Sequence, residues 1–244
     1  MVVEDNTEVR TFIKSLFTGQ YTVDEAGDGK EGWEKAKENV PDLIICDIMM
    51  PEMDGMELCK RIKTDIRTSH IPVIFLTAKA SDESRLQGLE TRADDYITKP
   101  FNNRILLSRI KNLIDLRRQL QEKFQRRMRL EPAEIDVSSI DQKFLEKLHG
   151  VIEECLSDFE LNVESLSEKM EISRVTLNKK ILALTGETAN EFIRSYRLKR
   201  AVQLLEKRAG NITKIALDVG FSSSAYFTKC FKEKFNRLPS EYID

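Results

Sequence analysis

The sequence has few of the residues that build metal centres and disulfide-stapled scaffolds. It contains four cysteines and two histidines in 244 residues, and no two cysteines form a CxxC pair. The cysteines have no companion histidines, and His70 and His149 are the only histidines in the sequence. A disulfide framework, a histidine-rich metal site and a histidine-kinase core are therefore poorly supported, and we expect reduced thiols.

Long apolar runs are also missing. No stretch approaches the roughly 18 apolar residues of a membrane helix, and the N-terminus lacks the basic and apolar regions of a signal peptide. Hydrophobic residues make up 41% of the chain and charged residues 33%, which is enough for real cores and typical of a soluble protein. We therefore expect a cytoplasmic chain without membrane contact, of one large or two ordinary domains.

The net charge of −2 conceals a segregation of charge along the chain. Residues 1–116 carry a net charge of −5, residues 117–130 of +5, residues 131–160 of −7 and residues 161–244 of +5. An acidic first domain suits a cation as partner, whereas a basic last segment suits a polyanion such as nucleic acid.

The first half alternates short apolar runs with amphipathic helical patterns. The runs predict strands at residues 1–3, 21–26, 43–46, 73–76 and 96–97, and the patterns between them predict helices at residues 8–17, 30–39, 56–64, 84–90 and 104–116. This alternation indicates a parallel sheet covered on both faces. The sequence therefore predicts an α/β fold, a flavodoxin-like, doubly wound (βα)5 domain with its site at the carboxyl ends of the strands.

Three carboxylates follow two of these strands. Glu4 and Asp5 come after the first strand and Asp47 after the third. Because neighbouring parallel strands end at the same edge, the carboxylates should meet and repel one another, and Mg2+ would relieve that repulsion through oxygen ligands. Asp47 could then act as a nucleophile toward a phosphoryl group. Thr77 and Lys99 follow two further strands, where they could hold the phosphoryl oxygens, and a cis Lys99–Pro100 bond would direct the lysine inward.

These residues stand in motifs that resemble a known family. The segments VVEDN, DIMMPEMDG, TA at 77–78 and YITKPF occur in order and with the spacing of the receiver domain of two-component response regulators. The resemblance implies that Asp47 is the phosphoacceptor of a histidine kinase. It implies Mg2+ on Asp5, Asp47 and the Met49 backbone carbonyl, with Glu4 acting through water. It also implies Thr77 and Tyr96 as a switch pair that reshapes an α4–β5–α5 output face, often a dimer surface.

The second half is helical and contains two segments with the plan helix, tight turn, helix. In the first, a helix ends near Met170 and another opens at Ser173. In the second, a helix ends at Val219, Gly220 suits a left-handed turn, and the next helix opens within residues 222–224. A continuous helix at residues 188–208 would hold the two units apart, and reading successive major grooves requires a spacing of about 34 Å.

The segments IRSYRLKRAVQLL and IALDVGFSSSAYFTKCFKEKFNRLPSEY resemble the AraC-type DNA-binding domain. The resemblance implies two recognition helices that present these residues to DNA: Arg174, Val175, Thr176, Asn178, Lys179, Ser224, Ala225, Thr228 and Lys229. We expect Lys180, Arg197, Lys232 and Lys234 to contact phosphates.

The sequence thus predicts a receiver domain at residues 1–120, a linker at 121–139 and a DNA-binding domain at 140–244, whose first helix spans residues 140–159. Residues 117–140 support either a rigid dimer helix continuing from the receiver or a loose linker. The expected function is a phosphorylation-dependent transcription regulator that dimerises, with a histidine kinase and double-stranded DNA as partners. It is not expected to be an enzyme beyond its own phosphorylation and slow dephosphorylation. The alternatives are a phosphorelay adaptor whose helical half binds protein, and a phosphotransferase with Asp47 as nucleophile. Because the chain begins within the first strand, a hybrid sensor that also contains the kinase is the expected parent.

Overall fold

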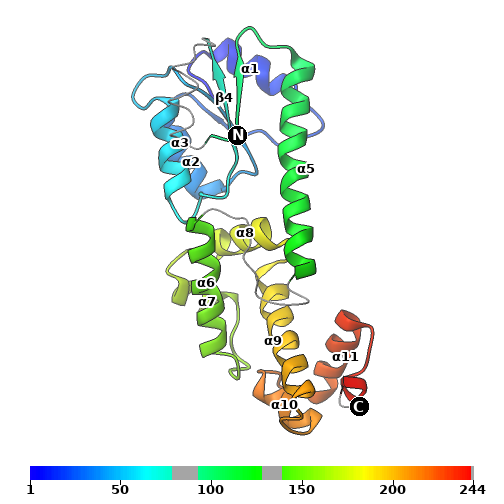
Figure 1. Ribbon diagram of the computed structural model, residues 1–244. Helices are drawn as coiled ribbons and strands as arrows, with labels where there is room; N and C mark the ends of the chain where they lie inside the picture. Colours follow the sequence, from blue (N-terminus) through cyan, green and yellow to red (C-terminus); the bar gives the residue numbers. More distant parts are fainter. Residues whose placement is uncertain (79–92, 128–138, 243–244) are drawn as a thin grey trace. The chain divides into compact units, whose positions relative to one another are not determined.

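Five short parallel strands form one sheet in the order β2-β1-β3-β4-β5 (Figure 1). The computed structural model describes residues 1–78, 93–127 and 139–242. The strands are β1 (Val2–Val3), β2 (Glu25–Ala26), β3 (Ile44–Asp47), β4 (Val73–Thr77) and β5 (Asp95–Thr98). This strand order is that of the flavodoxin-like fold, so the fold class predicted for the first half is confirmed.

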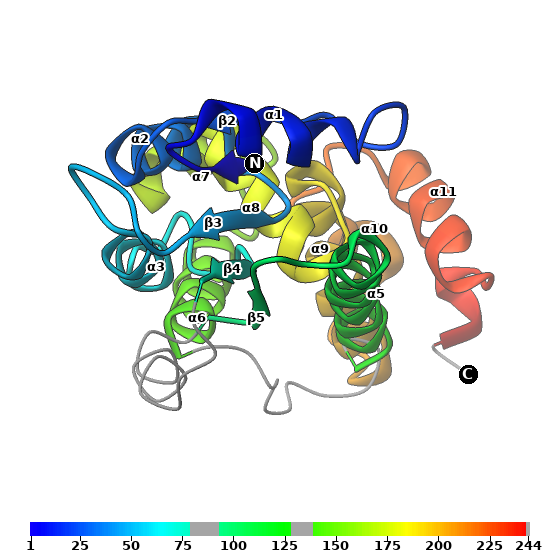
Figure 2. The same cartoon turned by 90° about the horizontal axis from the view of Figure 1, so that it is seen from above.

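Four described helices cover the two faces of this sheet: α1 (Thr7–Ser15), α2 (Gly29–Asn39), α3 (Gly55–Thr64) and α5 (Asn103–Arg127). One apolar cluster joins β3 and β4 to α2 and α3, through residues such as Ala36 and Leu58. The other joins the opposite sheet face to α1 and α5, through Ile13 and Leu106. Figure 2 shows α2 and α3 on the side of the sheet away from α5. The helix expected at residues 84–90 lies outside the described residues.

Helix α5 extends beyond the predicted end at residue 116 and reaches Arg127. Its first turns pack against the sheet through Leu106 and Ile110, which are buried. Farther along, Leu116 and Leu120 are 52% and 38% exposed. The rest of the expected linker, residues 128–138, lies outside the described residues.

The second half consists of α6 (Ser139–Glu154), α7 (Val163–Met170), α8 (Arg174–Thr185), α9 (Ala189–Glu206), α10 (Ile212–Asp218) and α11 (Ser224–Phe235), followed by a short 3-10 helix (Pro239–Tyr242). Side chains cap these helices: Ser173 accepts from Thr176 N, Ser223 from Tyr226 N, and Thr188 forms a capping box with Glu191. Gly220 adopts the left-handed conformation with φ +79°.

One predicted boundary in this half is wrong. Helix α6 ends at Glu154 rather than near Phe159. Beyond it, Asp158 Oδ1 accepts from the backbone N–H of Glu160 at 2.9 Å, which is a turn that competes with helix. Phe159 is 64% exposed and so is not part of the apolar stripe.

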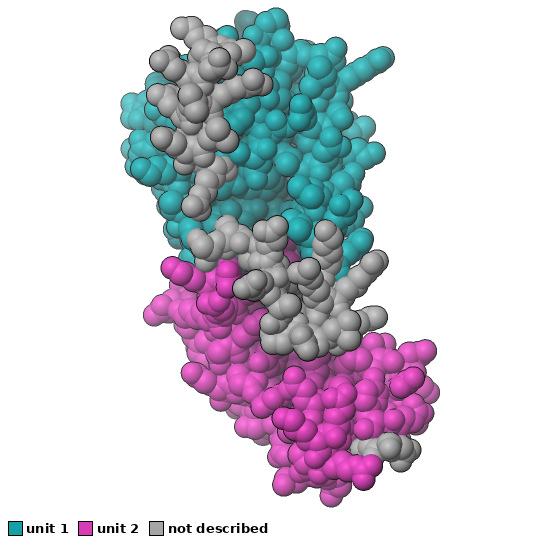
Figure 3. Space-filling view, in the orientation of Figure 1, with its two compact units in different colours: residues 1–124, 135–141 teal, residues 125–134, 142–244 magenta. Residues whose placement is uncertain are grey.

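The chain divides into two compact units, one built on residues 1–124 and one on residues 142–244 (Figure 3). No helix in the described ranges is long and apolar enough to cross a membrane. All four cysteines are described, and all are free thiols, as expected.

Candidate functional site

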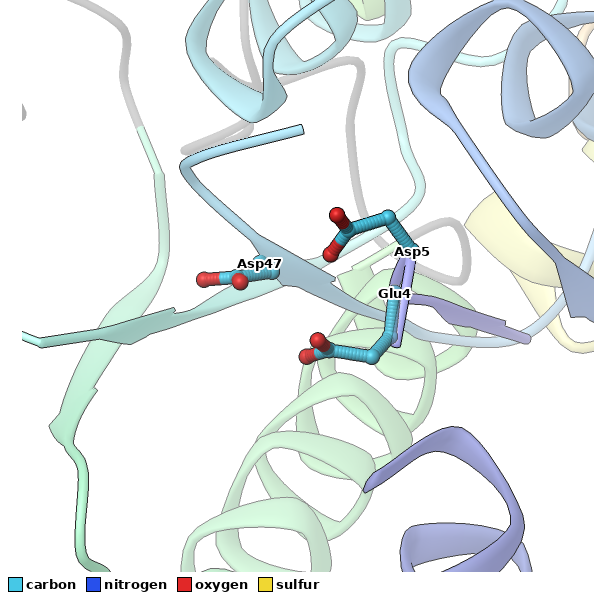
Figure 4. Close-up of side chains that lie close together, drawn as sticks. All are labelled: Glu4, Asp5 and Asp47. Atoms are coloured by element: carbon cyan, nitrogen blue, oxygen red, sulfur yellow. The ribbon is translucent and has the colours of Figure 1, made fainter. Parts of the chain in front are cut away.

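The register of the parallel strands brings three carboxylates together at the carboxyl edge of the sheet. Val3 pairs with Cys46, so Glu4 and Asp47 are the next residues on adjacent strands, with Asp5 one step beyond. One carboxylate oxygen from each of the three lies within 4.8 Å of the other two (Figure 4). Glu4 and Asp47 are buried, whereas Asp5 is exposed. The edge lies at the point where the strand order reverses, between β1 and β3.

Lys99 joins this acidic cluster from the end of β5. Its Nζ lies 2.8 Å from Glu4 Oε2 and 2.9 Å from Asp47 Oδ2. Burial raises the pKa of the Glu4 carboxyl, and the hydrogen bond from Lys99 opposes that shift. Burial also acts to lower the pKa of Lys99, but its hydrogen bonds to Glu4 and Asp47 outweigh this and raise it. The ammonium is therefore held charged beside Asp47.

The donor set fits a hard divalent cation. Three carboxylates against one ammonium leave the cluster with excess negative charge, and carboxylate oxygens are the ligands that Mg2+ prefers. Asp5 is exposed, so an ion can reach the cluster from its side, whereas Asp47 is buried. Glu4 is 2% exposed and accepts from Lys99, so it is less accessible to an ion than Asp5.

The loop after Asp47 is shaped by close backbone packing. Ile48 N–H donates to Asp47 Oδ1 at 2.8 Å, and Gly55 N–H donates to the Ile48 carbonyl at 2.9 Å. A Cβ atom at Gly55 would lie 2.1 Å from the Asp47 carbonyl oxygen, so only glycine fits there. Met49 lies in this loop with its side chain 76% exposed.

Thr77 and Tyr96 occupy different levels of the sheet. Asp47 pairs with Leu76, so Thr77 lies one residue farther along the neighbouring strand, at the same edge as the acidic cluster. Lys99 N–H donates to the Thr77 carbonyl at 2.7 Å, and the Lys99–Pro100 bond is cis. Tyr96 lies earlier on β5, where its ring packs 5.5 Å from that of Phe75. The structure thus groups Thr77 with Asp47 and Lys99 and places Tyr96 within the sheet.

Sequence reasoning missed Arg10 on α1. Its guanidinium donates to the Glu4 backbone carbonyl and lies 3.6 Å from Glu25 on β2. It therefore fastens the loop that carries Glu4 and Asp5 to the neighbouring strand. Arg10 belongs to none of the motifs, and no spacing in the sequence identifies this contact.

In the helical unit, the first candidate recognition helix is α8, and it does not present all the residues expected of it. Arg174 and Val175 are exposed, and Lys179 is half-buried. Thr176, by contrast, is 4% exposed, and its hydroxyl contacts Ser173 Oγ at 2.8 Å. Asn178 Oδ1 accepts from Ala189 N–H at 2.9 Å, at the start of α9. Thr176 therefore faces the interior of the domain, and the Asn178 side-chain oxygen is occupied by the hydrogen bond at the start of α9.

Of the four expected phosphate contacts, two are buried and a third, Lys234, is bound to another side chain. Lys180 is fully buried, with Nζ 5.0 Å from the centre of the Phe144 ring. Arg197 is 8% exposed and donates to the Asp158 carbonyl. Lys234 binds Glu187. These expectations are corrected for Lys180 and Arg197, because buried cations cannot reach the DNA backbone; Lys232 is exposed.

The second candidate recognition helix, α11, follows its expectation more closely. Ala225 and Lys229 are exposed, and Ser224 and Thr228 are half-buried. Thr228 Oγ1 donates to the Ser224 carbonyl at 2.9 Å. Opposite them, Phe227 and other apolar residues pack against α9 and α10.

Comparison with known proteins agrees with both units. Residues 1–111 match the family model of the response regulator receiver domain, and residues 166–244 match that of a helix-turn-helix domain. The chain therefore belongs to the response regulators, with a receiver domain followed by an AraC-type helix-turn-helix domain.

Among curated relatives, "Histidine kinase P4" of Formosa agariphila is 46% identical over 99% of this chain and 18% of its own length. The "Transcriptional regulatory protein AfsQ1" of Streptomyces coelicolor is 39% identical over 47% of this chain and 50% of its own. The chain thus spans less than a fifth of the first relative and half of the second. Among solved structures, the receiver domain of Francisella response regulator 1452 is 38% identical, covers 47% of this chain and 93% of its own, and has a TM-score of 0.43.

Proposed function

We propose that this chain is a DNA-binding transcription regulator switched by phosphorylation of Asp47. The observation that carries the proposal is the arrangement around Asp47: two further carboxylates within 4.8 Å and the Lys99 ammonium at 2.9 Å. Such a site offers a nucleophilic oxygen, ligands for a cation and a fixed positive charge for a phosphoryl group.

In the proposed reaction, an Asp47 carboxylate oxygen attacks the phosphorus of a phosphohistidine on a histidine kinase. The new oxygen–phosphorus bond forms as the phosphorus–nitrogen bond breaks, and the imidazole keeps the electron pair. Lys99 and the Thr77 hydroxyl bind the phosphoryl oxygens. Asp5, Asp47 and the Met49 carbonyl would hold Mg2+, with Glu4 acting through water, and the ion would supply charge neutralisation for the transferred group.

The proposed output is a receiver dimer. Phosphorylation would draw Thr77 and Tyr96 toward the site and reshape the face formed by β5, α5 and the expected helix at residues 84–90, which lies outside the described residues. On α5, Ile105, Leu116 and Leu120 are 53%, 52% and 38% exposed, which supplies apolar area for a partner. Dimerisation would raise the effective concentration of the paired DNA modules.

DNA recognition would use the residues that remain accessible on α8 and α11. Arg174, Val175 and Lys179 line the first helix, and Ser224, Ala225, Thr228 and Lys229 the second. Lysine and arginine side chains can contact guanine or phosphate, and the small residues on α11 leave room for water-mediated contacts. In place of the buried cations, Lys232 is the phosphate contact that we retain.

The kinase partner is proposed from the similarity to a protein named as a histidine kinase that is much longer than this chain. A kinase in the same polypeptide would deliver its phosphohistidine to Asp47 at high effective concentration. The chain would then act in the cytoplasm as the output portion of a hybrid sensor.

Phosphorylation is tested by incubating the chain with acetyl phosphate and Mg2+ and measuring its intact mass. We expect wild type to gain one phosphoryl group on Asp47, and Asp47→Asn to gain none. Asp42→Asn is the matched control, because Asp42 is exposed just before β3, the strand that ends in Asp47, and it should be phosphorylated like wild type. Equal phosphorylation of Asp47→Asn would refute the assignment.

A further inference from the structure

A closed triangle of polar side chains connects the two helix-turn-helix units. Lys234 Nζ on α11 donates to Glu187 Oε1 at 2.7 Å and to Ser195 Oγ at 2.9 Å. Ser195 Oγ in turn donates to the same Glu187 oxygen at 2.8 Å. We call these three residues the inter-unit cluster. Because each member contacts both of the others, moving one breaks two hydrogen bonds.

The cluster lies where the ends of the two candidate recognition helices approach α9. Glu187 follows the end of α8, and its backbone N–H donates to the buried Thr185 hydroxyl at 3.1 Å. Gly186 between them ends α8 in the left-handed conformation, with φ +73°. The position of Glu187 is therefore tied to α8, whereas Lys234 belongs to the last turn of α11 and Ser195 to α9.

Burial makes this contact stronger than an ordinary surface ion pair. Ser195 is 4% exposed, and the side chains of Glu187 and Lys234 are 14% and 31% exposed. Exposed pairs contribute little because water and salt screen them; a largely covered pair with a third hydrogen-bonding partner is screened less. Helices α8 and α11 each contact α9, and the Glu187–Lys234 pair adds a direct link between them.

We propose that the inter-unit cluster sets the separation and orientation of α8 and α11, and thereby the spacing of the two DNA elements that one chain reads. The proposal rests on the DNA-binding function proposed above. Two recognition helices that enter successive major grooves must lie about 34 Å apart, and one added base pair shifts the second element by about 3.4 Å. A rigid link is therefore needed if the chain is to reject a site with altered spacing.

This role differs from that of a phosphate contact. Two of the three donors of the Lys234 ammonium are already engaged inside the protein. A phosphate contact would strengthen binding to every DNA alike, and its loss would reduce the salt dependence without changing the preferred spacing. Lys234, Glu187 and Ser195 are thus positioning residues, and spacing preference is the property that distinguishes them.

The test is selection from a random double-stranded DNA library by the full chain in beryllium fluoride and Mg2+. We expect wild type to enrich pairs of elements at one spacing, one pair for each chain of the dimer. Lys234→Met should enrich the same elements over several spacings and should discriminate about tenfold less between the selected spacing and one longer by a base pair. Lys207→Met removes the same charge from the exposed end of α9 and should retain the wild-type spacing.

A charge exchange completes the experiment. Glu187→Lys alone should broaden the range of selected spacings. Glu187→Lys combined with Lys234→Glu should narrow that range again, because the ion pair is restored with opposite polarity. This pair of variants decides the matter even if Lys234→Met does not fold, which thermal unfolding will show. Uniformly weaker binding of the Lys234 variants at an unchanged spacing overturns the inference while leaving the DNA-binding function intact. If wild type enriches no DNA, the proposed function fails and the inference falls with it.

Discussion

The two halves of this chain place their functional side chains by different physical means. In the receiver, Asp47 and Thr77 end their strands and Glu4 and Lys99 directly follow theirs, and parallel register brings all four to one edge. In the helix-turn-helix domain, a residue reaches the surface only if its turn of helix faces away from the core. In the sheet, the position of a residue in the sequence therefore predicts well where its side chain lies. On a helix, whether a side chain is exposed or buried depends on how the helix packs.

The largest expected effect tests the receiver side of this comparison. Gly55→Ala puts a Cβ atom 2.1 Å from the Asp47 carbonyl oxygen, so the loop must move. We expect the free energy of unfolding of the receiver to fall by about 3 kcal/mol and phosphorylation of Asp47 to slow. The free energy of unfolding is measured by urea unfolding followed by the fluorescence of Trp33, which packs on the receiver core. A stability unchanged from wild type would show that the loop does not need this close packing.

The next effect separates two adjacent lysines on α8. Lys180 is fully buried, so Lys180→Ala should lower the free energy of unfolding of the helical domain by about 2 kcal/mol through lost packing. Lys179→Ala should change stability by no more than about 0.5 kcal/mol and should weaken DNA binding instead. Circular dichroism on denaturation and DNA titration of the two variants distinguish these outcomes. The reverse pattern would mean that α8 is rotated relative to the packing described.

The third prediction concerns the pH dependence of the stability of the helical domain, where another ionisable side chain is partly buried. His149 on α6 packs against Phe192 and Tyr196, and burial, aided by Lys199, lowers its pKa from 6.5. The unfolded chain therefore binds this proton more readily, so stability is fully present above pH 6.5 and falls as the pH drops toward the folded pKa. His149→Phe should flatten this decline between pH 7 and 5 in urea unfolding of the helical domain. Equal slopes in variant and wild type would contradict the prediction.

The smallest expected effect comes from a second glycine-to-alanine change, at a position where the added Cβ atom has room. Gly150 lies inside α6, and a Cβ atom there would meet nothing within 4 Å. Gly150→Ala should therefore raise the free energy of unfolding by about 0.5–1 kcal/mol through helix propensity. Thermal unfolding checks the sign. Destabilisation would reveal packing at this position that the described residues do not show.

The sequence predicted the receiver well because motif and register agree. Every strand was located, and the expected site residues other than Tyr96 meet at one edge, although their chemical roles stay predictions. Arg10 was missed because its contact with Glu4 depends on where α1 lies against β2. The predictions were weaker in the helical half, where charge was taken as a sign of exposure. Lys180 and Arg197 are basic yet buried. The Lys180 ammonium lies over the Phe144 ring, and the Arg197 guanidinium donates to the Asp158 carbonyl.

The most direct test of the account is DNA affinity as a function of phosphorylation. A tandem site obtained by selection is titrated with wild type and with Asp47→Ala, each with and without beryllium fluoride and Mg2+. We expect activation to tighten binding by wild type by at least about tenfold through dimerisation and to leave Asp47→Ala unchanged. Equal affinity of the two proteins under activating conditions would contradict the proposal that Asp47 controls the DNA-binding domain.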